Sequence, residues 1–189
     1  MVEQNAGRAD VMVLSTDTLI YGGLVDSRKH NIPLSTLQNR LKRIEGLKAR
    51  NKNVRIYGFG TVMRSPRASG GGTEPAYYAE YGPTIFQIAA LQDKLDSGSL
   101  TQEETQKLMS LQASVPVEYL QDWFDRRQKN MKINKELIDE TRSGVFDYFA
   151  LGHDDTSQLS QSALEGRYLN KYSKDISVEK YGSFPGADQ

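Results

Sequence analysis

Three polar side chains, His153, Asp154 and Asp155, directly follow an apolar run near the end of the sequence. The run Phe146–Leu151 is rich in β-forming aromatic residues and predicts a buried strand. Because parallel strands present functional groups at their carboxyl ends, we expect Asp154 and Asp155 to be catalytic and His153 to bind a ligand. Gly152 allows the chain to turn out of the strand, so that both carboxylates can reach one ligand.

Two carboxyl groups in one pocket favour general acid and base chemistry on a glycosidic bond. Close like charges raise one pKa and so separate the proton donor from the ionised group. Two alternatives stay open. A divalent cation such as Mg²⁺ or Ca²⁺ would find an oxygen-rich shell in Asp17, Asp154, Asp155 and Asp188, although their spacing matches no metal motif. A non-catalytic module would instead bind a carbohydrate or another small ligand. We expect no other cofactor.

Further polar residues follow the other predicted strands. Asp17 ends the apolar run that starts at Asp10, and Arg64 follows the β-rich run 54–59. Arg126 lies one helical turn after Asp122, a spacing that more often marks a solvated helix face than a site. The glycine-rich segment 67–75 is a lid candidate, although an inert surface loop explains it as well. The expected ligand-binding residues are Asp17, Tyr21, Arg28, Arg64, Arg126, His153 and Asp188.

The elements that must position these residues read as parallel βα units. Apolar residues recur every three or four positions in 35–50, where Ser35 is the expected cap, and again in 160–172. A further short strand is expected at 176–181. Successive right-handed crossovers place all strand ends on one side. We therefore predict an α/β fold that is TIM-barrel-like or a partial barrel, with an open doubly wound sheet as the alternative. Residues 76–143 form a helical insertion between the second and third strands.

The amino-acid composition argues against several classes of function. The 189 residues contain 24 Lys and Arg, 24 Asp and Glu, and no Cys, which argues against nucleic acid as a partner and excludes thiolate chemistry. The sequence has no apolar stretch that predicts a signal peptide or a membrane span, so we expect a cytoplasmic protein with a small-molecule or carbohydrate ligand. The chain is one α/β domain, 1–189, or a fragment of a larger one. A fragment would self-associate through exposed sheet edges.

Several of these segments, taken together, resemble a bacterial family, the domain-of-unknown-function family 4127. The resemblance implies that longer relatives carry a strand unit before Met1 and more chain after Gln189, so that this chain corresponds to a middle portion. His153 stands where Arg is expected, and Gln189 where Glu is expected. The family brings no established reaction. The matching pieces are Ser15–Asp17, Tyr21–Arg28, Met63–Pro66, Tyr77–Tyr78, Tyr81–Gly82, Asp122–Trp123, Arg126–Arg127, Asn130, Gly152, Asp154–Asp155 and Pro185–Asp188.

Overall fold

A four-stranded, all-parallel sheet forms the centre of the molecule, in the order β1-β2-β3-β4. This is a computed structural model, and it describes residues 2–68, 72–155 and 157–185. The parallel pairing confirms the prediction of an α/β fold built of βα units. The strands are β1 Val11–Ser15, β2 Arg55–Val62, β3 Tyr148–His153 and β4 Tyr181–Pro185.

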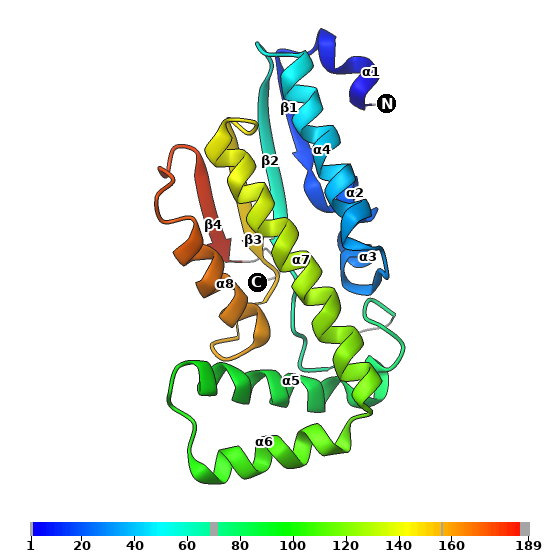
Figure 1. The fold of residues 1–189 in the computed structure, drawn as a ribbon, viewed down its shortest axis with the longest axis vertical. Coiled ribbons are helices and arrows are strands. Elements are labelled where there is room, and N and C mark those ends of the chain that lie inside the picture. Colours follow the sequence, from blue (N-terminus) through cyan, green and yellow to red (C-terminus); the bar gives the residue numbers. More distant parts are fainter. Residues whose placement is uncertain (1, 69–71, 156, 186–189) are drawn as a thin grey trace.

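Eight α-helices and one 3-10 helix accompany the sheet in the described residues, and none of these helices combines the length and the apolar composition needed to cross a bilayer. The helices α4, α7 and α8 lie on the same face of the sheet (Figure 1). The helices are α1 Val2–Asn5, η1 Ala6–Arg8, α2 Thr16–Tyr21, α3 Leu24–Lys29, α4 Leu34–Arg50, α5 Tyr78–Asp96, α6 Gln102–Ser114, α7 Val117–Ser143 and α8 Gln161–Tyr172.

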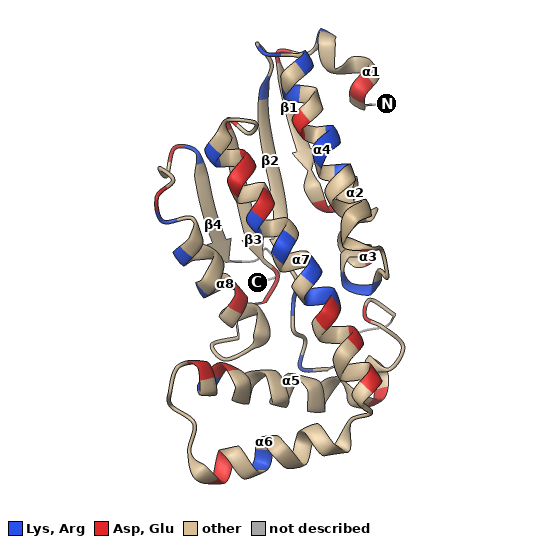
Figure 2. Ribbon diagram, viewed as in Figure 1, with Lys and Arg blue, Asp and Glu red and all other residues tan. Residues whose placement is uncertain are grey.

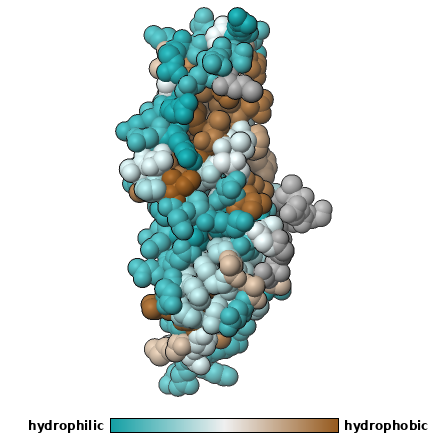
Figure 3. Space-filling model, turned by 90° about the vertical axis from the view of Figure 1, so that its right-hand side faces the viewer, coloured by the Kyte–Doolittle hydropathy of each residue, from teal (hydrophilic) through white to brown (hydrophobic). Residues whose placement is uncertain are grey.

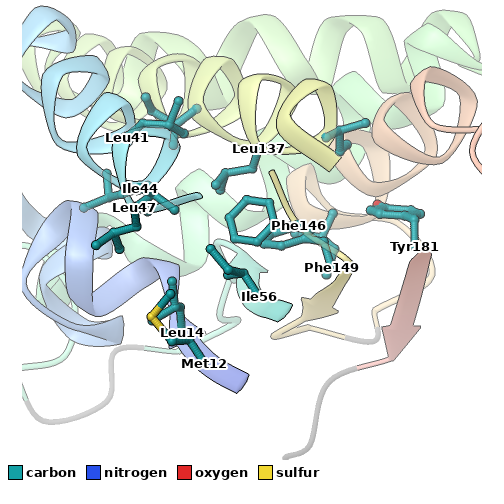
Figure 4. Close-up of a cluster of buried hydrophobic side chains, with 14 of the residues drawn as sticks. Met12, Leu14, Leu41, Ile44, Leu47, Ile56, Leu137, Phe146, Phe149 and Tyr181 are labelled. Atoms are coloured by element: carbon teal, nitrogen blue, oxygen red, sulfur yellow. The ribbon is translucent and has the colours of Figure 1, made fainter. Parts of the chain in front are cut away.

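The main core lies between the sheet and this helix layer (Figure 4). Alternate residues of each strand point into it, so that Ile56 and Val62 of β2 are fully buried. Gly58 lies on the same face, and a Cβ there would come within 2.6 Å of the Phe146 ring. Glycine at this position therefore leaves room for the rings of Phe146, just before β3, and Phe149, within β3, to pack over β2 in the core.

The crossover helix α4 shows the apolar spacing expected from the sequence. Its four inward residues are all buried, while Lys42, Arg43 and Arg50 are exposed and Lys48 is half-buried in an ion pair with Asp147. Ser35 is not its cap, which was the prediction, because the helix begins at Leu34 directly after Pro33 and no side chain caps it. The buried residues are Leu37, Leu41, Ile44 and Leu47.

Helices α5, α6 and α7 follow β2, as predicted for the segment between the second and third strands. A second apolar cluster, which includes Tyr78 and Trp123, joins them, and the capping box of Thr101 and Glu104 opens α6. The long helix α7 runs from this cluster across the sheet, and Gly144 ends it in the left-handed region at φ 86°. The α5–α6 pair lies beyond the carboxyl ends of the strands (Figure 1).

Two predictions for the C-terminal part were wrong. The strand expected at 176–181 begins only at Tyr181, because Lys180 and Tyr181 donate their backbone N–H groups to the Ser177 carbonyl and so close a turn. Tyr168 belongs to the apolar pattern of 160–172, which predicts that it points inward on α8, but it is 47% exposed. Its hydroxyl donates to Asp96 instead, so that a polar contact holds the ring at the surface.

Candidate functional site

The carboxyl edge of the sheet brings together polar residues from four separate segments. Asp17 lies in the first turn of α2, directly after β1; Asp154 follows β3; and Arg28 lies in the last turn of α3. Glu74 reaches the same place from the loop between β2 and α5. Figure 2 shows acidic and basic residues on these segments. The expected gathering of strand ends therefore occurs, with Glu74 as a member that the sequence did not predict.

Asp17 is a buried carboxyl group, 6% exposed. Ser15 caps α2 by accepting from the Thr18 N–H, which fixes the turn that carries Asp17. The Thr61 hydroxyl donates to Asp17 Oδ2 at 2.9 Å. Burial raises the pKa of Asp17 to about 6, and the charge of Asp154 adds to this rise, while the Thr61 hydrogen bond and Arg28 oppose it.

Asp154 forms an ion pair with Arg28, whose side chain is 5% exposed. The Arg28 Nη1 also lies 3.8 Å from Glu74 Oε1, so that one guanidinium lies between two carboxylates. Its Nε has no partner among the described residues. Arg28 thus pairs with Asp154 next to Asp17, whose pKa burial raises.

Arg64 extends the cluster toward the loop. Its Nε donates to Glu74 Oε1 at 2.7 Å, and its Nη2 donates to the Thr73 hydroxyl at 2.6 Å. Burial raises the pKa of Glu74, although Arg64 and Arg28 act in the opposite direction. The second carboxylate oxygen of Glu74 is buried and has no partner within the described part of the chain. The sequence marked the segment 67–75 as a lid candidate but did not single out Glu74, because one acidic residue in a glycine-rich segment has no spacing that predicts its contact.

The carboxylate of Asp155 accepts hydrogen bonds from two backbone N–H groups. Its Oδ2 accepts from the Ser65 N–H at 3.3 Å, and its Oδ1 accepts from the Ser157 N–H at 2.8 Å. These bonds fix the loop after β3 against the turn after β2. The adjacent aspartates therefore differ: the geometry favours Asp154 as a reacting group and Asp155 as a group that positions the loop.

His153 lies on the helix side of β3, in the same alternating set as the buried Leu151. Its Nε2 lies 2.6 Å from the Ser183 hydroxyl, and burial lowers its pKa. It lines a shallow pocket of about 410 Å³ beside α8, together with Asp155 and Arg167. Within the described part of the chain, His153 forms no hydrogen bond or ion pair with Asp17, Arg28 or Asp154, and its binding role stays a prediction.

Tyr21 and Arg126 have structural contacts. Tyr21 is 7% exposed and stacks on the His30 ring at 5.0 Å. Arg126 is 2% exposed; its donors reach the His30 carbonyl, Asn31, the Tyr77 hydroxyl and Asp122. The predicted pairing of Asp122 with Arg126 is present, at 2.8 Å. These contacts favour core roles for both residues rather than the predicted contact with a ligand.

The neighbouring Arg127 holds the backbone of the segment that carries Arg64. It is 1% exposed, pairs with Glu165 of α8 at 2.8 Å, and donates to the backbone carbonyls of Met63 and Arg64. It therefore ties α7 and α8 to the turn that carries Arg64. The sequence pointed to this helix face through the spacing of Asp122 and Arg126, but it did not distinguish the roles of the two arginines.

Two predictions reach beyond the described residues. Asp188 and Gln189 lie outside them, so the structure places neither. Within the ranges 2–68, 72–155 and 157–185, no three His, Asp or Glu side chains are arranged to hold a metal ion. The cation alternative included Asp188 and stays a prediction.

Comparison with known proteins gives one match. A family model described as protein of unknown function (DUF4127) matches residues 1–189, which is the whole chain. No curated protein and no solved structure matches it.

Proposed function

This chain belongs to the DUF4127 family, described as proteins of unknown function, and we propose that it is a hydrolase of the glycoside-hydrolase type. Asp17 is the general acid and Asp154 is the ionised carboxylate. The observation that carries the proposal is the contrast between these two groups. Asp17 is buried with a pKa of about 6, next to an aspartate that forms an ion pair with the buried Arg28.

This contrast is what glycosidic cleavage requires. One carboxyl group must give a proton to the leaving oxygen, while a second, ionised one attacks the sugar carbon or activates a water molecule. A pKa of about 6 lets Asp17 hold its proton at mildly acidic pH and take it back within each cycle. Different environments for two carboxyl groups are the usual means of assigning these roles.

The neighbouring unpaired atoms support a ligand rich in hydroxyl groups. Arg28 Nε is a donor without a partner, and Glu74 Oε2 is an acceptor without a partner, among the described residues. Buried polar atoms of this kind are costly unless a partner arrives. A hydroxyl group both donates and accepts, so a carbohydrate can satisfy both atoms, with Arg64 holding Glu74 in place.

We further propose that the sheet is part of a βα barrel. The strands follow one another in sequence order without the reversal that marks a doubly wound sheet. Helices α4, α7 and α8 all cover one face (Figure 1), which is the arrangement of the outer ring of a barrel. The candidate site then lies at the mouth where barrel enzymes place their chemistry.

The test is a screen of aryl glycosides with the unaltered protein, followed by variants on the best substrate. Asp17→Asn and Asp154→Asn should each lower kcat by about 100-fold or more, because each removes a group that acts in the transition state. The acidic group should appear as a limb of the pH profile near pH 6. Asp155→Asn is the matched control and should stay within a few-fold of the unaltered rate.

The alternatives predict different results in the same experiments. A non-catalytic module would keep its affinity for the sugar in both asparagine variants and would show no turnover. A divalent-metal hydrolase would lose activity in EDTA and regain it with Mg²⁺ or Ca²⁺, whereas the proposed mechanism is unaffected by the chelator. Turnover that persists in Asp17→Asn with an unchanged pH profile would exclude Asp17 as the acid.

A further inference from the structure

The shallow pocket of about 410 Å³ beside α8 is separate from the cluster at Asp17. Figure 3 shows the side of the molecule that carries α1 to α4, where hydrophobic side chains gather in the upper half. The pocket lies at the opposite edge of the sheet, on β4, and most of its lining residues carry polar side chains. Of the described residues, Asp17, Arg28 and Asp154 are not in its lining, so any chemistry there is distinct from that of the proposed hydrolase site.

The pocket brings a hydroxyl group against an imidazole. Ser183 of β4 stands opposite Leu151, which belongs to the same alternating set of β3 as His153, so both polar side chains point to the helix side of the sheet. The Ser183 hydroxyl oxygen lies 2.6 Å from His153 Nε2, and both residues are half-buried. A hydroxyl and an imidazole at this distance have the geometry of a nucleophile and its base.

The imidazole is suited to take a proton from that hydroxyl. Burial lowers the pKa of His153, so the ring is mostly neutral at pH 7. In the tautomer that carries its proton on Nδ1, the Nε2 atom accepts from the Ser183 hydroxyl. A neutral imidazole in that position can remove the proton as the oxygen attacks a substrate.

Helix α8 makes room for the imidazole by carrying a glycine. Gly166 is buried in the middle of the helix, where glycine is less favourable than alanine. A Cβ at this position would come within 2.4 Å of His153 Cε1 and 2.7 Å of its Nδ1. The helix therefore lacks a side chain at the point where the ring needs space, and this close packing holds the ring beside Ser183.

The rest of the lining suits a small substrate with a carbonyl oxygen. Asn170 of α8 lines the pocket, and its side-chain amide forms no hydrogen bond within the described part of the chain. Its N–H groups can donate to an oxygen that gains negative charge. Asp155 and Arg167 contribute one charge of each sign, so the lining favours an uncharged molecule, and Ala163 adds an apolar wall.

We propose that Ser183 and His153 form a second catalytic site, which hydrolyses small uncharged esters. The Ser183 oxygen forms a bond to the carbonyl carbon, its proton passes to His153 Nε2, and the alcohol leaves with that proton as its bond to the carbonyl carbon breaks. Water then attacks the acyl group on Ser183 with His153 again as base, which releases the acid and restores the hydroxyl. Esters are favoured over amides because no carboxylate pairs with His153 among the described residues, and an alcohol leaves with less help from an acid than an amine does.

The first test is covalent labelling with a fluorophosphonate, which requires no knowledge of the natural ester. A reactive serine oxygen forms a bond to its phosphorus, fluoride leaves, and the serine proton passes to the base. The unaltered chain should gain the mass of one phosphonyl group, on the peptide that contains Ser183, and Ser183→Ala should gain none. Ser143→Ala is the matched control, because Ser143 is an exposed serine at the end of α7 whose hydroxyl bonds to Glu140, and this variant should label fully.

His153→Gln tests the base separately from the contact. Glutamine can keep a hydrogen bond to Ser183 but cannot take its proton, so the rate of labelling and the turnover of p-nitrophenyl acetate should each fall by about 100-fold or more, with an unchanged far-UV circular dichroism spectrum. A pair with a merely structural role would leave both rates unchanged. An unaltered chain that gains no adduct, an adduct on another serine, or a His153→Gln variant that labels at the full rate would overturn the proposal.

Discussion

The buried carboxyl group of Asp17 makes a prediction about stability that needs no substrate. Its pKa in the folded protein is about 6, whereas that of an unfolded aspartate is about 3.8. The folded state therefore binds the proton more tightly, so this group favours folding fully below about pH 3.8, and the contribution is lost as the pH rises to about 6. At about 1.4 kcal/mol per pKa unit, the loss amounts to about 3 kcal/mol.

Asp17→Asn removes this titration while keeping an oxygen that can accept from Thr61. Relative to the unaltered protein, the variant should gain about 2.4 kcal/mol in the free energy of unfolding between pH 4 and pH 7, because part of the total is already lost at pH 4. Urea unfolding at both pH values measures the gain. Asp10→Asn, which changes an exposed aspartate just before β1, is the control and should show no such gain. If the two asparagine variants respond alike to pH, the burial argument for Asp17 is refuted.

Three further substitutions test the supports of the site and fold, each by urea unfolding at neutral pH. Gly58→Ala should destabilise the protein by about 1–3 kcal/mol, because the new methyl group would meet the Phe146 ring at 2.6 Å; an unchanged midpoint would mean that the ring moves freely. Arg127→Met should cost about 3–5 kcal/mol, because it leaves Glu165 buried without its cation, and adding Glu165→Gln should recover part of the loss. Thr101→Ala should cost about 1 kcal/mol through loss of the α6 cap, and a cost above about 2 kcal/mol would contradict a purely local role.

The main elements of the fold were predictable because each has a local signal. The apolar spacing of α4, the capping box at Thr101 and the glycine that ends α7 depend on neighbours within a few residues. The strand at 176–181 failed for a related reason. Its apolar and β-branched residues fit a strand, but a turn centred on Ser177 competes for the same backbone groups, and only the pairing with β3 decides where β4 starts.

The candidate site was predictable only in part. The rule that parallel strand ends meet placed Asp17 and Asp154 together, and Arg28 lies beside them on α3, one short helix after Asp17. It could not show that Glu74 returns from the loop to the same place, because that contact joins segments with no shared pattern. Nor could it separate Asp154 from Asp155, since their roles depend on which backbone N–H groups lie nearby.

The hydrogen bonds from Arg127 to the turn after β2 bear on which residues of that turn can change among relatives. Its hydrogen bonds to the turn after β2 end on backbone carbonyl oxygens, which every amino acid has. The turn therefore keeps its place whichever side chain stands at Met63 or Arg64. If the proposed function holds, substitution at position 64 would change what the edge of the sheet binds while the backbone beneath it keeps its place, so that new specificities would need only single substitutions.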